Sequence, residues 1–491
     1  MKPFIKRTAP VLGLLGLGLA SCQPDIEAPS VSAGSADFSR YISVGNSLTA
    51  GYADGGLYRE GQLNSYPSIL AGQFALVGGG DFMQPLFTEA QSNGGGYLRL
   101  AGFTTATATS FSAPITAPVT TNLAVRGGTA QNPLYTQFLD PINNLGVPGI
   151  RMSDIQTPGY GSTQGNPYFE RITPPALALQ TYLQRVQATV ASIKPTFFTE
   201  WLGNNDVLGY ATAGGAASFI TPTATFTTNT GLVLDALVAG GAKGLVATIP
   251  DVTGIPFFTT VGPSYRASLD LNKVPVTAAP LIYTTGILAP GQPNTRVLTA
   301  KLSDIRDAGG NGNLLLTLTA SPYLRFYGQP SGKYWRDFYK QATGAAPTGP
   351  TDPVYNGFLR GLAVDTTKAF GQSTGNPFPS TLVLDPTEQT TVATATTALN
   401  SALIAAANAR NLAVFDANVF FRTVAVNGFA TNAVNNTAGY LSGNLFGLDG
   451  VHPTPRGYSV IANEMLKAIN AKYGSSFQGV NPNTYRGVVF P

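Results

Sequence analysis

Short apolar stretches that predict β-strands alternate along this chain with longer stretches that predict α-helices, and this alternation constrains the fold most. Strands are predicted at residues 38–44, 196–202, 245–249 and 412–415. Helices are predicted at residues 177–193, 232–239 and 386–410, and from Thr454 onward. This order favours an α/β fold, in which helices cover both faces of a parallel sheet. Functional sites in such sheets form at the carboxyl ends of the strands.

Two long segments interrupt the alternation. Residues 78–136 are rich in Gly, Thr, Ala and Pro, which predicts loops and short strands, and a glycine-punctuated loop is expected at residues 142–149. Residues 257–378 carry an aromatic group made of Tyr323, Phe326, Tyr327, Tyr334, Trp335, Phe338 and Tyr339. We expect these rings to form a small core of that segment, with a substrate platform as the alternative. The 491 residues therefore indicate either one large domain with insertions or two domains.

The first 21 residues are typical of a secretory signal. Lys2, Lys6 and Arg7 precede an apolar run at residues 11–19, which is too short to span a bilayer. The run ends in Leu19-Ala20-Ser21-Cys22. This motif resembles the bacterial lipobox, whose cysteine receives a lipid and becomes the new N-terminus. The alternative is a plain secretory signal followed by a chance cysteine.

Residues 22–37 predict a flexible tether between this signal and the body of the protein. No later stretch has 18 consecutive apolar residues, so no membrane-spanning helix is expected. We therefore expect a lipid on Cys22 to hold the protein in the bacterial cell envelope, at the periplasmic or surface face of the outer membrane.

The composition excludes several classes of function. Without the three basic residues of the signal, the chain has 26 basic and 25 acidic residues and no basic run, so a nucleic-acid partner is not expected. Cys22 is the only cysteine and His452 the only histidine. A lone cysteine excludes disulfides within the chain. One cysteine and one histidine are too few soft ligands for a metalloenzyme, so we expect neither a metal nor a cofactor.

His452 is also the only side chain with an unperturbed pKa near neutral pH. Asp449 lies three residues before it, a spacing that lets the carboxylate orient and charge-stabilise the imidazole. Taken alone, the pair is more typical of an ordinary surface histidine in a loop before a helix. A catalytic interpretation needs a nucleophile and an oxyanion hole elsewhere in the chain. Ser47 lies on a sharp turn after the first predicted strand, and a glycine and an asparagine follow other strands.

These residues form a pattern that resembles the SGNH hydrolases, also called the GDSL esterase/lipase family. The family's Gly-Asp-Ser-Leu block is similar to Gly45-Asn46-Ser47-Leu48, which implies that Ser47 is the nucleophile. The family's Asp-x-x-His block matches Asp449 and His452 and implies that these residues complete a Ser-His-Asp triad. Asn46 stands where the family usually has aspartate, and we expect different local hydrogen bonding there.

Two further blocks imply the oxyanion hole. An asparagine followed five residues later by glycine matches Asn144 and Gly149, so the Gly149 N–H would join that of Ser47 as a donor. Gly146 is the alternative glycine. The Gly-x-Asn-Asp block matches residues 203–206, which assigns the side-chain donor to Asn205 and leaves Asp206 a structural role in the turn.

The resemblance implies a three-layer α/β/α sandwich with a parallel sheet, spanning residues 38–475 and carrying insertions at about 78–136 and 257–378. Residues 476–491 would then be a C-terminal tail. The distances along the chain are long for the family: 102 residues from Ser47 to Gly149 and 247 from Asn205 to His452. Val383-Leu384-Asp385-Pro386 and the helix after it also resemble lipoprotein members from Bacteroidetes-type bacteria.

The implied activity is that of a lipid-anchored serine esterase or lipase acting on a small-molecule or lipid ester. Two alternatives stay open. One is a carbohydrate O-acetyl esterase that uses the same site on acetylated glycans. The other is a non-catalytic surface lipoprotein that binds glycans.

Overall fold

The computed structural model describes residues 30–105, 114–216, 218–286, 296–431 and 433–491. Its centre is a five-stranded, all-parallel sheet with the strand order β13-β8-β7-β1-β6. The strands are β1 (Tyr41–Gly45), β6 (Asn144–Gly146), β7 (Phe197–Trp201), β8 (Lys243–Ala247) and β13 (Ala413–Phe415). The four predicted strands and the α/β class are confirmed.

The fifth strand, β6, corrects the prediction of a loop at residues 142–149. It has only three residues, Asn144, Leu145 and Gly146, and two of these residue types are rare in strands. Pairing with β1 over Ser43, Val44 and Gly45 makes the segment a strand. Tertiary pairing therefore overrides the local preference at this edge of the sheet.

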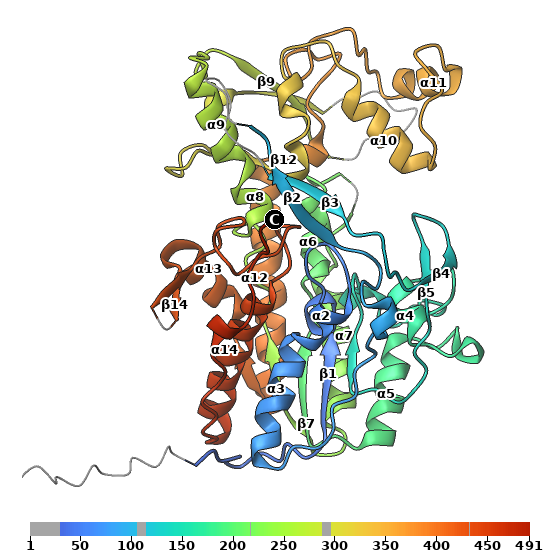
Figure 1. The fold of residues 1–491 in the computed structure, drawn as a ribbon, viewed down its shortest axis with the longest axis vertical. Coiled ribbons are helices and arrows are strands. Elements are labelled where there is room, and N and C mark those ends of the chain that lie inside the picture. Colours follow the sequence, from blue (N-terminus) through green and yellow to red (C-terminus); the bar gives the residue numbers. More distant parts are fainter. Residues whose placement is uncertain (1–29, 106–113, 217, 287–295, 432) are drawn as a thin grey trace, which may run out of the picture.

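Alternate strand residues point to opposite faces of the sheet, and each face has its own apolar cluster. Ile42, Phe198 and Val246 belong to a cluster with α5 (Tyr182–Ile193), α7 (Thr223–Val238) and α12 (Pro386–Ala409). Tyr41, Phe197 and Leu245 belong to a second cluster with α3 (Tyr66–Phe74) and α14 (Pro455–Tyr473). Figure 1 shows helices on both sides of the strands. The predicted helices are thus present, although α5 begins later than expected and α7 begins earlier.

Capping groups define where the long helices begin. Asp385 Oδ1 accepts the Glu388 N–H and Glu388 Oε2 accepts the Asp385 N–H, a capping box that starts α12. Thr181 and Gln184 form the same box before α5, so this helix begins later than residue 177. Thr454 caps α14 with Pro455 at its first position. The loop that holds Asp449 and His452 therefore ends at a fixed helix start.

Residues 257–378 form a separate apolar cluster, at the top of Figure 1. Trp335 is fully buried in it and donates its indole N–H to Asn376 Oδ1 at 2.9 Å. The other six aromatic residues of the predicted group lie in this cluster or pack against it, as expected of a local core. The segment contains α8 (Pro256–Thr259), α9 (Val261–Leu271), α10 (Lys333–Thr343), α11 (Pro353–Gly361), β9 (Pro280–Thr284), β10 (Val297–Lys301) and β11 (Leu315–Leu316).

Residues 78–136 contain two antiparallel strand pairs, in agreement with the predicted loops and short strands. The pairs are β2 (Leu98–Phe103) with β3 (Pro114–Pro118), and β4 (Val125–Gly128) with β5 (Pro133–Tyr135). The remaining elements are α1 (Ser47–Ala50), α2 (Arg59–Leu63), α4 (Pro167–Arg171), α6 (Asn205–Thr212), β12 (Val383–Leu384), α13 (Ala417–Asn427), β14 (Phe429–Thr431) and β15 (Val434–Asn436).

Both described ends of the chain pack on the body. Ser35 N–H donates to Tyr473 O at 2.8 Å and Ala36 is buried, so residues 30–37 belong to the fold. This shortens the flexible tether predicted for residues 22–37. Residues 476–488 also pack on the body, with Phe477 buried in the α3–α14 cluster, whereas residues 489–491 are exposed. The predicted signal and Cys22 lie outside the described residues.

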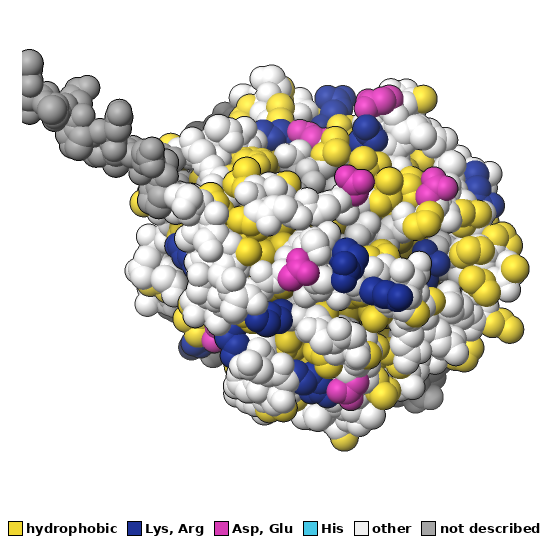
Figure 2. Space-filling model, turned by 90° about the horizontal axis from the view of Figure 1, so that it is seen from below, with side chains coloured by type: hydrophobic (Ala, Val, Ile, Leu, Met, Phe, Trp, Pro, Cys, Tyr) yellow, Lys and Arg dark blue, Asp and Glu magenta, His cyan; other side chains and the backbone are white. Residues whose placement is uncertain are grey.

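None of the described helices is long and apolar enough to cross a membrane. Figure 2 views the molecule from the end near residue 30, where Lys and Arg side chains lie interspersed with Asp and Glu. This face therefore carries no continuous field of one charge.

Glu200 is a fully buried carboxyl group in the middle strand β7. One oxygen accepts the Leu202 N–H at 2.9 Å, and the other has no partner among the described residues. Burial raises the pKa of Glu200 to about 8. The folded protein therefore keeps this proton up to about pH 8, whereas the unfolded chain releases it near its ordinary value of 4.5.

Glu200→Gln is expected to change how stability depends on pH. In the wild-type protein the free energy of unfolding falls as pH rises from about 4.5 to 8, by up to about 4 kcal/mol from this group alone. Glutamine does not titrate, so the variant loses that part of the slope. Urea unfolding at pH 5, 7 and 9 gives the free energy of unfolding of both proteins. The difference between the two proteins at each pH isolates the contribution of Glu200, because the other buried acids contribute equally to both. A constant difference across the three pH values would contradict the assignment.

Candidate active site

Ser47 lies at the carboxyl end of β1 and is the first residue of α1. Asn46 caps this short helix, because its Oδ1 accepts the Leu48 N–H at 3.0 Å. Thr49 and Trp201 pack closely against Gly45, where a Cβ would lie 2.0 Å from Thr49 Oγ1 and 2.7 Å from Trp201 O. Ser47 itself is 7% exposed. Its backbone N–H stands in the first turn of a helix and has no acceptor among the described residues.

The Asn46 side chain both caps this short helix and leaves one buried group unpaired in the part of the chain that the structure describes. Helix capping needs only an acceptor oxygen, which asparagine supplies. The Asn46 Nδ2 is buried and has no partner among the described residues. Asn46 therefore supplies the cap that an aspartate could also supply, with that unpaired donor beside it.

His452 joins Ser47 to Asp449. The distance from His452 Nε2 to Ser47 Oγ is 2.9 Å, and that from His452 Nδ1 to Asp449 Oδ2 is 2.7 Å. The His452 and Asp449 side chains are each 15% exposed, so the pair is sheltered but open to a reactant. The Tyr52 ring lies 4.6 Å from the imidazole, centroid to centroid. The predicted triad residues are thus brought together in one chain of hydrogen bonds.

The Asp449 carboxylate is held on several sides. Its Oδ1 accepts the N–H groups of Val451 and His452, each at 2.9 Å, and its Oδ2 also accepts the Gly55 N–H at 2.8 Å. Burial acts to raise the pKa of Asp449, but the charge and hydrogen bonds of His452 and the Val451 N–H lower it below its usual value. Asp449 is therefore ionised at neutral pH and can stabilise an imidazolium.

Gly149 occupies the third position of a turn after β6. The Ile150 N–H donates to Val147 O at 3.2 Å, and Gly149 has φ +83°, a conformation that favours glycine. Its N–H has no acceptor among the described residues. By contrast, the Gly146 N–H donates to Asn144 Oδ1 at 2.9 Å, and a Cβ on Gly146 would lie 2.3 Å from Ala50 N. Gly146 is therefore a close-packing residue, and only Gly149 offers a free donor.

Asn205 begins α6, at the carboxyl end of β7. Its Nδ2 donates one hydrogen to Ile150 O at 2.9 Å, which fixes the amide beside the Gly149 turn and leaves a second hydrogen. Asp206 accepts the N–H groups of Met152 at 2.8 Å and Ser153 at 3.4 Å. It therefore has a structural role, but its carboxylate holds the 3₁₀ helix Met152–Asp154 and not the expected turn at residues 203–206. Burial raises the pKa of Asp206 to about 6.

The sheet brings these groups to one edge. Gly45 of β1 pairs with Gly146 of β6 on one side and with Trp201 of β7 on the other. Ser47, Gly149 and Asn205 follow these positions within four residues. Two backbone N–H groups and one amide hydrogen, with no acceptor among the described residues, thus lie at the same edge of the sheet as Ser47. This arrangement can bind the oxyanion that forms when a serine attacks a carbonyl.

Replacement of Asn205 tests this donor set. We expect Asn205→Ala to lower kcat for ester hydrolysis about 10²- to 10³-fold with little change in KM, because the lost hydrogen bond strengthens in the transition state. Asn204→Ala is the matched control, since the neighbouring Asn204 side chain is not one of these donors and its buried Oδ1 has no partner among the described residues. Equal losses in both variants would indicate damage to the turn instead of a lost oxyanion contact.

Sequence reasoning missed part of the site. Tyr52, Gly55 and Asp54 surround the Asp449 loop, and Arg486 reaches Asp54 from the end of the chain. The Asp54-Gly55 dipeptide is a turn signal that could have been found, but its long-range partners carry no local pattern.

Among the described residues, no group of His, Cys, Asp and Glu could hold a metal ion.

No family model, curated protein or solved structure matches this chain.

Proposed function

We propose that this protein is a serine ester hydrolase of the SGNH type. The observation that carries the proposal is the chain of contacts from Ser47 Oγ through His452 to Asp449, at 2.9 and 2.7 Å. An ordinary surface histidine before a helix would need neither a serine hydroxyl at Nε2 nor a carboxylate at Nδ1. A glycan-binding protein has no need of the free donors at Ser47, Gly149 and Asn205 either. Hydrolysis uses all of them.

The proposed reaction has two steps. His452 Nε2 takes the proton of Ser47 Oγ as the oxygen attacks the ester carbonyl carbon, and the N–H groups of Ser47 and Gly149 and the Asn205 amide hold the oxyanion. His452 then returns the proton to the leaving alcohol. A water molecule deprotonated by His452 then attacks the acyl-enzyme carbonyl, and His452 Nε2 returns that proton to Ser47 Oγ as the acid is released. Asp449 stays ionised and stabilises the imidazolium in both steps.

The finer architecture is part of the proposal. Residues 38–475 would be one SGNH domain, a three-layer α/β/α sandwich with insertions at about 78–136 and 257–378. The separate apolar cluster of the second segment supports its treatment as an insertion. We also propose that a lipid on Cys22 holds the protein in the bacterial cell envelope, at the outer membrane.

An ester series tests the activity and its substrate class. We expect the wild-type protein to hydrolyse p-nitrophenyl esters, because the triad and donor set need only an accessible carbonyl. Comparison of acetyl, butyryl and octanoyl esters with acetylated xylan then separates an esterase or lipase from a carbohydrate O-acetyl esterase. Absence of hydrolysis on every ester would contradict the proposed function.

A further inference from the structure

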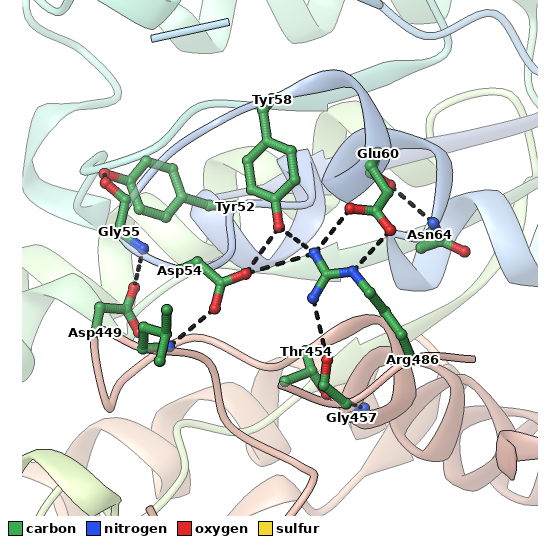
Figure 3. Close-up of polar contacts among 12 residues, drawn as sticks. Tyr52, Asp54, Gly55, Tyr58, Glu60, Asn64, Asp449, Thr454, Gly457 and Arg486 are labelled. Atoms are coloured by element: carbon green, nitrogen blue, oxygen red, sulfur yellow. Dashed lines mark hydrogen bonds and ion pairs between the residues drawn. The ribbon is translucent and has the colours of Figure 1, made fainter. Parts of the chain in front are cut away.

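A second polar cluster lies against Asp449 and contains Asp54, Gly55, Tyr58, Glu60 and Arg486 (Figure 3). These residues come from the loop after α1, from α2 and from the last residues of the chain. None of them takes part in the reaction proposed above. The cluster nevertheless contacts the Asp449 loop at two consecutive residues.

The first contacts come from a tight turn at residues 53–56. Ala53 and Gly56 exchange backbone hydrogen bonds at 3.0 and 2.9 Å, and the two residues between them have φ values of +51° and +78°. From this turn the Gly55 N–H donates to Asp449 Oδ2 at 2.8 Å, and the Asp54 Oδ1 accepts the Leu448 N–H at 2.9 Å. The turn therefore fixes both the Asp449 carboxylate and the backbone just before it.

The Asp54 carboxylate is only 4% exposed and needs a counter-charge. Its Oδ2 accepts the Tyr58 hydroxyl at 2.9 Å and lies 3.5 Å from Arg486 Nη2. Burial raises the pKa of Asp54, while the Leu448 N–H, Arg486 and Tyr58 act to lower it. Loss of Arg486 would favour a neutral carboxyl group that no longer attracts these donors.

Arg486 is itself held in one orientation. Its Nε and Nη2 donate to the two oxygens of Glu60 at 2.7 and 2.8 Å, and Nη2 also donates to the Tyr58 hydroxyl at 2.7 Å. The Arg486 carbonyl accepts the N–H of Arg456 in the first turn of α14 at 2.9 Å. A fork of this kind fixes direction as well as charge. The end of the chain is thus tied to the loop that carries the triad acid.

We propose that Arg486 and Asp54 are positioning residues, which act through the Gly55 turn to keep the Asp449 carboxylate aligned with His452. The inference rests on the proposed hydrolase function for its effect on turnover. It gives residues 476–491, expected to be a tail, a role in the alignment of the active site.

The test uses the full chain and measures both its turnover and the NMR signal of the His452 imidazole. We expect Arg486→Gln and Asp54→Asn to lower kcat about 10- to 100-fold with little change in KM, because a misplaced carboxylate aligns the base poorly. Asparagine accepts a positive φ, so Asp54→Asn leaves the turn unstrained. His452 is the only histidine, so labelling with [15N]histidine gives a single imidazole in NMR spectra. Its Nδ1–H signal is expected to move upfield or disappear in both variants.

Arg410→Gln is the control, because Arg410 makes a comparable ion pair with Asp235 and has no contact with the site. It should retain both the turnover and the imidazole signal of the wild-type protein. Arg486→Lys keeps the charge but not the fork, so partial activity is expected, and this variant replaces Arg486→Gln if the latter does not fold.

A wild-type imidazole signal in Arg486→Gln and Asp54→Asn would overturn the inference, whatever their turnover. If no ester were hydrolysed but the signal still depended on Arg486, the positioning would stand and only the hydrolase function would fail.

Discussion

Ser47→Ala is expected to lower kcat for p-nitrophenyl esters about 10⁴- to 10⁶-fold, because it removes the only hydroxyl that contacts His452 Nε2 among the described residues. The substitution deletes one oxygen from a side chain that is 7% exposed, so the fold should persist. Circular dichroism and thermal unfolding check that point alongside the assay. The residual rate reflects the oxyanion donors and substrate binding alone.

Ser43→Ala is the matched control for this prediction. Ser43 lies in the same strand, β1, and its Oγ is buried without a partner among the described residues. Removal of an unpaired hydroxyl is close to neutral for stability, so activity should stay within about 2-fold of wild type. Undiminished hydrolysis by Ser47→Ala would exclude Ser47 as the nucleophile.

His452→Ala is expected to cause a loss of similar size. His452 accepts the Ser47 proton in the proposed reaction, and the chain contains no other imidazole that could replace it. Because the two residues act as one unit, the double variant Ser47→Ala/His452→Ala should be no slower than either single variant. The assay is the same ester hydrolysis, measured from pH 5 to 9.

Activity that persisted in His452→Ala would contradict the mechanism directly, since no second histidine exists to explain it. A double variant that lost activity in proportion to the product of the single losses would also contradict it. Such additivity would mean that Ser47 and His452 contribute independently.

Much of the sheet could be predicted because its strands are local apolar runs, as at residues 196–202. Strand β6 could not, since Asn144 and Gly146 have low strand propensity and pairing with β1 makes the strand. The start of α7 was also missed. Its first turns, from Thr223, consist mostly of threonine, which has low helix propensity.

The candidate site, like the sheet, could be predicted only where its residues belong to local motifs. Asp449 and His452 lie three residues apart and Ser47 follows a strand, so local motifs indicated them. The Gly55–Asp449 contact joins residues 394 apart, and no periodicity marks such a pair. The choice between Gly146 and Gly149 depends on which N–H is already bonded, and only the structure assigns the Gly146 N–H to Asn144.

A fluorophosphonate probe tests the central claim most directly, because it reacts with serine hydroxyl groups that a neighbouring base activates. The full chain is treated with the probe and digested, and the modified residue is identified by mass spectrometry. The account predicts modification at Ser47 in the wild-type protein and in Ser43→Ala, and none in Ser47→Ala or His452→Ala. An unlabelled wild-type protein, or labelling that persists without His452, would contradict it.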